Sequence, residues 1–84
     1  MIDRFGEKLR VLRKRQQMTL TQLAEALGYT AHSNSYLSLI EQGKKKPTAE
    51  LIFKVARLFG VSTDQLMDDT QNLPETAPAR EDNK

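Results

Sequence analysis

The 84-residue chain contains no cysteine, no tryptophan and a single histidine, His32. The absence of thiols excludes disulfides and thiolate metal sites, and one imidazole is too few for a cluster of nitrogen ligands. Long apolar runs are also absent, because runs such as Leu51–Phe53 fall far short of a membrane span. Charged residues interrupt the N-terminus, so no secretory signal is recognisable. We therefore expect a soluble cytoplasmic protein without metal or cofactor.

The sequence also lacks recognisable groups of catalytic residues. The sequence holds no Ser-His-Asp arrangement, no suitably placed pair of carboxylates and no glycine-rich phosphate loop. The adjacent Asp68 and Asp69 are more simply the exit of a helix. Neither internal repeats nor the alternation typical of β-strands is present. The sequence therefore predicts a small all-α domain that is not an enzyme.

The net charge of +2 conceals an uneven distribution of charge. Residues 1–47 carry nine Lys and Arg against four acids, a net charge of +5, whereas residues 48–84 carry four against seven, a net charge of −3. The cations gather in two runs, Arg13–Arg15 and Lys44–Lys46. Charge runs are commonly solvated surface, but two of them around one pair of helices favour a surface that binds a polyanion.

The pair of helices between these runs begins at Thr19, whose side chain suits an N-cap. Gly28 ends the first helix, because glycine readily takes the left-handed conformation needed there. Four residues at helical spacing form its apolar stripe: Leu20, Leu23, Ala24 and Leu27.

The second helix of the pair, residues 33–42, offers little apolar surface to a core. Leu37 and Ile40 face inward, Tyr36 lies half-way, and Gly43 ends the helix. Most of its circumference is therefore available to a partner. We interpret that partner as the major groove of DNA.

Further helices are predicted on both sides of this pair. The first covers residues 4–16, with Asp3 as its N-cap, and has its apolar residues on one face: Ile2, Phe5, Leu9 and Leu12. After Pro47, Thr48 caps a fourth helix with a broad buried face: Leu51, Ile52, Val55, Ala56, Leu58 and Phe59.

A short fifth helix follows Gly60. Ser62 and Gln65 stand at capping-box spacing at its start, and Leu66 and Met67 supply its apolar side chains.

The composition changes after residue 68. The remaining residues include prolines and many charges but only scattered apolar side chains, which is typical of a disordered segment. We expect a folded domain over residues 1–68 and a flexible acidic, proline-containing tail over residues 69–84.

Two stretches carry a resemblance to a known family. TQLAEALGYT and YLSLIEQGKKKPTAELIFKVARLFGVSTDQLM, in this order, closely resemble the helix-turn-helix domain of the Cro/C1 (XRE) group, the lambda-repressor-like transcriptional regulators. The resemblance covers about residues 4–68. It implies a compact five-helix domain whose third helix enters the major groove of double-stranded DNA. It also implies a sequence-specific regulator, a repressor acting as a homodimer on a palindromic operator.

Carried over to this sequence, the base-reading positions of the family fall near the start of the third helix. They are Asn34 and Ser35, with Leu39 one turn further on and Ser38 close enough to assist. An Asn amide can bond an adenine edge, a Ser hydroxyl can donate or accept, and an aliphatic side chain can pack on a thymine methyl. The alternative is that Asn34 and Ser35 only cap the helix.

The resemblance also implies contacts to DNA phosphates. The family commonly has Gln as the first residue of its second helix, where it binds a phosphate and braces the third helix. Leu20 stands there in this sequence, and Thr21 or Gln22 is the candidate to replace it. The expected phosphate-binding residues are Thr19, Thr21, Gln22, His32, Tyr36, Lys44, Lys45, Lys46, Arg10, Arg13 and Lys14.

The segment between Gly28 and Gly43 is about three residues longer than the usual pattern. Either residues 29–33 form a longer turn, or the third helix begins early with Thr30 as its cap. In the second case the face turned to the groove shifts towards His32.

Two expectations concern partners. The resemblance implies dimerisation, for which the apolar candidates are Leu66, Met67 and Leu73. The alternative function is a protein-interaction module, an antitoxin or adaptor with the same fold, whose C-terminal tail folds on a protein partner.

Overall fold

The computed structural model describes residues 4–73 and consists, over this range, of five α-helices and one 3₁₀ turn without any strand. The elements are α1 (Phe5–Arg15), α2 (Leu20–Ala26), η1 (Ala31–Ser33), α3 (Asn34–Glu41), α4 (Ala49–Phe59) and α5 (Thr63–Met67). The predicted all-α, five-helix class is confirmed. The expectations for Ile2, Asp3 and most of the tail fall on residues 1–3 and 74–84, outside the described range.

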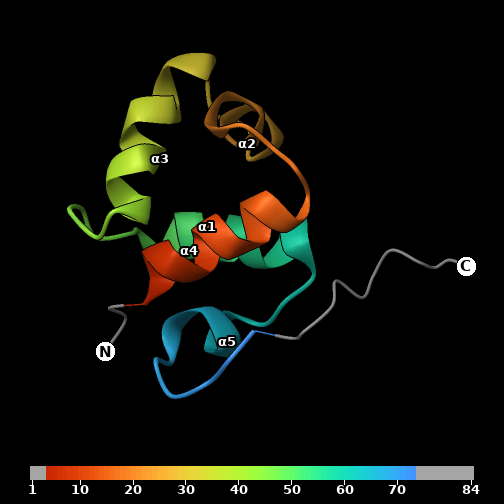
Figure 1. The fold of residues 1–84 in the computed structure, drawn as a ribbon, viewed down its shortest axis with the longest axis vertical. Helices are drawn as coiled ribbons and strands as arrows, with labels where there is room; N and C mark the ends of the chain where they lie inside the picture. The colour runs from red at the N-terminus through yellow and green to blue at the C-terminus, as the bar shows by residue number, and fades with distance from the viewer. Residues whose placement is uncertain (1–3, 74–84) are drawn as a thin grey trace, which may run out of the picture.

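The helices form two groups around α1. The helices α2 and α3 lie side by side on one side of α1, while α5 lies on the other side and α4 runs behind α1 (Figure 1). Every helix contributes to one apolar core, whose fully buried members include Phe5, Leu9, Leu23, Leu37, Leu51 and Leu66. This arrangement leaves α3 supported on its inner side only.

The predicted N-caps are present at three helix starts. The Thr19 hydroxyl accepts from the Gln22 amide at 3.0 Å, and the Gln22 side chain accepts from the Thr19 amide at 2.9 Å, which forms a capping box. Thr48 caps α4 through the Leu51 amide at 3.1 Å. A second capping box begins α5: Ser62 and Gln65. Each cap satisfies amides that the first helical turn leaves unpaired. The N-cap of α1 is Arg4, without a side-chain bond.

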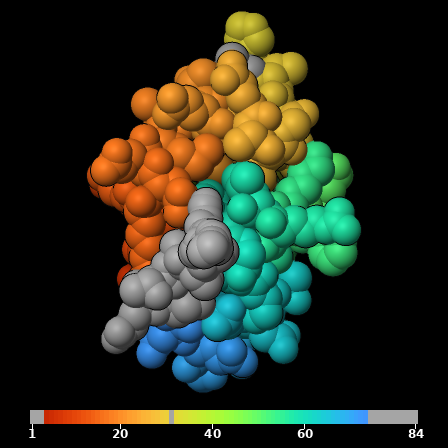
Figure 2. Space-filling view, turned by 90° about the vertical axis from the view of Figure 1, so that its right-hand side faces the viewer, coloured from red at the N-terminus to blue at the C-terminus, as the bar shows by residue number. Residues whose placement is uncertain are grey.

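The buried face of α4 is narrower than the sequence predicts. Leu51, Ile52, Val55 and Ala56 are buried, and Phe59 is partly buried, but Leu58 is 39% exposed. The prediction for Leu58 is therefore wrong. Leu58 lies beside the C-terminal end of α2. Because α2 ends there, a shallow hollow remains next to Leu58 and no side chain of the described residues covers it. Figure 2 shows the side of the molecule on which α2, the ends of α1 and α4, and α5 come together.

A buried lysine joins α1 to α5. Lys8 is 1% exposed, and its ammonium group donates to the backbone carbonyls of Gln65 at 2.5 Å and Asp68 at 2.9 Å. Burial lowers the pKa of Lys8 from its ordinary value, with the neighbouring Arg4 acting in the same direction. Arg4 also donates to the carbonyl of Asp69 at 3.0 Å. Lys8 therefore holds the end of α5 and adds no charge to the surface.

The expected domain boundary after residue 68 coincides with the end of α5, but contacts continue beyond it. The backbone amide of Arg4 donates to the Asp69 carboxylate at 3.0 Å, and Leu73 packs against the core. The segment that follows α5 is thus attached to α1 at least as far as the described residues extend.

Candidate nucleic-acid interface

The connection between α2 and α3 decides where the third helix begins. Gly28 has a φ of +86°, and the amide of Tyr29 donates back to the Ala24 carbonyl at 2.9 Å, which closes the end of α2. The 3₁₀ turn η1 then leads directly into α3, and its first bond runs from the Ser33 amide to the Thr30 carbonyl at 3.0 Å. The additional residues therefore form a separate 3₁₀ turn directly ahead of α3, and the N-cap of α3 is Ser33 and not Thr30.

The inner and outer sides of α3 differ as the sequence predicts. Leu37 and Ile40 are buried at 0% and 1% exposure, and Tyr36 is half-buried. The exposed side chains recur at spacings of three and four residues, from η1 to the residue after α3: His32, Ser35, Leu39 and Gln42. We call these four residues the outer stripe of α3. Residues at this spacing share one face of a helix, so the stripe is continuous.

Asn34 connects α3 to α2. Its side-chain amide donates to the Thr21 hydroxyl at 3.2 Å, and its carbonyl oxygen accepts from the Ser35 hydroxyl at 3.4 Å. Thr21, rather than Gln22, is therefore the α2 residue that braces α3. Leu20, at the family's usual Gln position, is partly buried against the core instead. The capping alternative for Asn34 and Ser35 has no support, because the N-cap is Ser33 and no side chain caps this end.

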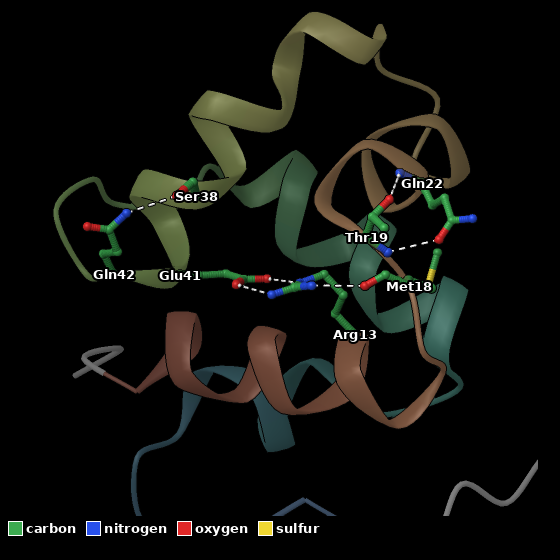
Figure 3. A network of polar contacts seen from close by, with 7 residues as sticks. All are labelled: Arg13, Met18, Thr19, Gln22, Ser38, Glu41 and Gln42. Atoms are coloured by element: carbon green, nitrogen blue, oxygen red, sulfur yellow. Dashed lines mark hydrogen bonds and ion pairs between the residues drawn. The ribbon is translucent and has the colours of Figure 1, made fainter.

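Gln42 is a site residue that the sequence-based predictions do not include. This exposed residue follows α3, and its amide nitrogen donates to the Ser38 hydroxyl at 2.9 Å (Figure 3). It stands three residues after Leu39 and seven after Ser35, so helical spacing alone places it on the outer stripe.

Arg13 points inward, towards α3. Its guanidinium donates to both carboxylate oxygens of Glu41, at 2.8 and 3.0 Å, and to the carbonyl of Met18 at 2.9 Å (Figure 3). The side chains of Arg13 and Glu41 are only 13% and 6% exposed. Bidentate pairing of this kind fixes two elements in orientation. Arg13 therefore anchors the end of α3 to α1. Its guanidinium, which the sequence predicts as a phosphate ligand, is bound within the domain instead.

The remaining phosphate candidates lie around α3 in two places. At the C-terminal end of α3, the chain turns out of the helix at Gly43, with a φ of +77°, into three exposed lysines: Lys44, Lys45 and Lys46. Near the N-terminal end are the exposed Thr19, Gln22 and His32 and the half-buried Thr21 and Tyr36. On α1, Arg10 and Lys14 are exposed. Arg10 lies four residues after Gly6 and thus on the side of α1 that faces α3.

Gly6 sets the distance between α1 and α3. An ideal Cβ at this position would lie 2.1 Å from the carbonyl oxygen of Ile40 and 2.9 Å from that of Glu41. The two backbones therefore meet without a side chain between them. No local signal in the sequence indicates this contact, because the residues involved are far apart along the chain.

The fold and this surface together define a class of protein. Two adjoining helices joined by a short connection, with the second exposing a polar stripe and followed by cations, form a helix-turn-helix DNA-binding domain. The sequence model of the helix-turn-helix family matches residues 9–66. The chain belongs to this family, of the Cro/C1 (XRE) type, and the predicted resemblance is confirmed. Members of the family are DNA-binding transcriptional regulators.

Several curated proteins are similar to this chain. An uncharacterised HTH-type transcriptional regulator of Mycobacterium tuberculosis is 36% identical over 61 residues, which cover 73% of this chain and 41% of that protein. The regulator YobD of Bacillus subtilis is 35% identical, over 81% of this chain and 58% of its own length. The transcriptional repressor RghR of Bacillus subtilis is 34% identical, over 94% and 57%. The chain thus spans about half the length of these relatives.

The described part of the chain lacks the features of two other kinds of site. Within residues 4–73, no three His, Asp or Glu side chains gather closely enough to hold a metal ion. No helix in the same range is long and apolar enough to cross a membrane.

Proposed function

We propose that this protein is a transcriptional repressor that binds a palindromic operator as a homodimer and thereby blocks access to a promoter. The observation that carries the proposal is the outer stripe of α3, which is supported from behind by α1 and α2 and followed by three exposed lysines. A helix presented in this way fits the major groove, where base edges differ in their donors and acceptors. The repressor RghR, a relative of the chain, supports the assigned direction of regulation.

Contacts to phosphates set the position of α3 in this proposal. Lys44, Lys45 and Lys46 hold one strand beside the C-terminal end of α3, and the exposed Arg10 on α1 adds a further phosphate contact. Polar side chains bind the backbone at the other end: Thr19, Thr21, Gln22, His32 and Tyr36. Lys14 adds to the attraction at longer range. Such contacts supply affinity without sequence information. Arg13 is excluded from this set, because its donors are bound to Glu41 and Met18.

Base edges are read by residues near the start of α3 and one turn further on. Ser35 and Leu39 belong to the outer stripe, and Asn34 and Ser38 flank it. The dimer forms through the exposed Met67 and the half-buried Leu73, whereas Leu66 is fully buried in the core and is left out of the dimer surface.

The decisive test is selection of bound duplexes from a random pool, followed by the stoichiometry of the complex on the selected duplex. We expect an enriched sequence with two-fold symmetry and two protein chains per duplex. A pool that stays random after selection would contradict the proposal and favour the adaptor or antitoxin hypothesis.

Lys45→Ala is expected to weaken binding to specific and random duplexes alike. The variant loses one phosphate contact, so the slope of log affinity against log salt falls by about one. Titrations at two salt concentrations measure both effects. Arg57→Ala is the matched control, because it removes an exposed cation that lies over the Phe53 ring on α4, away from α3. An equal change of slope in both variants would remove the specific role of Lys45.

Asn34→Ala is expected to relax the choice of base at one position, at a cost of about 1–3 kcal/mol for the selected duplex and much less for random DNA. Thr21→Val is the comparison variant, since it removes the acceptor that braces Asn34 and leaves the Asn34 amide in place. Because Thr21 is also a phosphate-binding residue in this proposal, its loss should weaken specific and random duplexes alike and leave the choice of base unchanged. Selection experiments on both variants separate reading from bracing. Equal losses on specific and random duplexes for Asn34→Ala would exclude a reading role.

A further inference from the structure

The chemistry of the outer stripe also indicates which bases it can read. We propose that the base pairs facing α3 in each operator half-site are A·T pairs, with a thymine methyl group packed against Leu39. This inference rests on the proposed function and names the class of DNA sequence that the same surface takes.

The outer stripe contains no lysine or arginine. His32, Ser35, Leu39 and Gln42 are its exposed members, and the flanking Asn34 and Ser38 are uncharged as well. Guanine presents two acceptors in the major groove, and the commonest specific contact to it is a bidentate Arg or Lys. The stripe has no such side chain. The three lysines that follow α3, Lys44–Lys46, lie beyond Gly43 in a loop that swings away from the axis of α3 (Figure 1), and Arg13 is bound to Glu41.

The stripe also lacks an acceptor suited to cytosine. Cytosine offers an amino donor in the major groove, for which a carboxylate is the usual partner. Glu41 is the only acid in α3. Its two carboxylate oxygens are bound by Arg13 at 2.8 and 3.0 Å, and its side chain is only 6% exposed. The pair that anchors α3 to α1 therefore removes the one carboxylate that could favour a G·C pair.

The groups that remain match adenine and thymine. The Gln42 amide uses one N–H on Ser38, which fixes its orientation, and keeps its second N–H and its carbonyl oxygen for a partner. An amide with one donor and one acceptor pairs with the N6 and N7 edge of adenine. Leu39 is 39% exposed between polar neighbours, and the thymine methyl is the apolar group of the major groove that suits it.

The length of the stripe sets the number of base pairs involved. From Ser35 to Gln42 the helix rises by roughly 10 Å. A helix of this length in the major groove faces only a few successive base pairs. The proposal therefore concerns a short A·T segment in each half-site and makes no statement about the flanking positions.

The experiment starts from the duplex selected above and replaces each thymine of the half-site by deoxyuridine, one at a time, which removes only the methyl group. We expect one replacement to weaken binding of the unmodified protein about threefold to fourfold, as for one buried methyl group. Leu39→Ala should bind the thymine and uracil duplexes equally. Leu58→Ala is the matched control, because Leu58 is also 39% exposed but lies on α4, and it should retain the preference for thymine.

Three outcomes would overturn the inference. They are a selected half-site with G·C pairs at the positions facing α3, equal binding of all uracil and thymine duplexes by the unmodified protein, and a preference for thymine that persists in Leu39→Ala. All three leave the proposed function intact, because a sequence has then been selected. Failure to select any duplex would instead contradict the proposed function.

Discussion

Gly6→Ala is expected to destabilise the domain by about 3 kcal/mol or more, although alanine is intrinsically better in a helix than glycine by about 1 kcal/mol. The added Cβ would lie 2.1 Å from the Ile40 carbonyl oxygen, which belongs to the backbone and cannot move aside by a rotamer change. The substitution therefore forces α3 away from α1. Chemical denaturation of both proteins measures the difference in the free energy of unfolding.

Glu7→Ala is the matched control for this variant. It places alanine at the next position of α1, where the side chain is exposed, and should change stability by less than about 1 kcal/mol. A Gly6→Ala protein as stable as the unmodified one would show that α1 and α3 do not meet backbone to backbone. Gly6→Ala should also lose DNA affinity under conditions in which it remains folded, because the outer stripe is then displaced.

Arg13→Met is expected to cost about 3 kcal/mol of stability, because the Glu41 carboxylate then stays in a buried site without its partner. Methionine retains much of the apolar stem of arginine, so the loss reports chiefly on the charge. The double variant Arg13→Met with Glu41→Leu should recover most of the loss, since no unpaired charge remains. Denaturation of the single and double variants forms a double-mutant cycle.

One result of this double-mutant cycle would contradict the anchoring role of Arg13 and Glu41. If the losses of Arg13→Met and Glu41→Leu simply added in the double variant, the two side chains would not be coupled and the anchoring role of the pair would be wrong. Lys14→Met serves as the control, because Lys14 is the exposed neighbour of Arg13 and its loss should change stability by less than about 0.5 kcal/mol.

The basic run Arg13–Arg15 shows why the number of adjacent cations in a sequence does not give the number of cations on the surface. A sequence shows three adjacent cations, but adjacent residues on a helix point in different directions. Arg13 turns to Glu41, 28 residues away, whereas Lys14 is exposed. Lys8 is a second example, since it counts as a cation in composition but is buried against the end of α5. The number of cations in the sequence therefore overstates the positive surface of this protein.

Local features followed well from the sequence. The caps Thr19, Thr48 and Ser62 were predictable, because a cap involves residues only three positions apart. The seam of Leu37 and Ile40 and the ends of helices at Gly28 and Gly60 were predictable for a similar reason, since helical spacing and backbone conformation are properties of short segments.

The sequence by itself thus determined the five helices, their inner faces, the family and the place of the third helix within it. Only the tertiary structure decided that Thr21 braces Asn34, that Arg13 binds Glu41, that Gly6 touches the backbone of α3 and that Leu58 stays exposed. The physical reason is the range of the interaction: helix propensity, capping and periodicity act within a turn or two. The partner of a side chain across the core depends on how whole helices pack, which no short segment encodes.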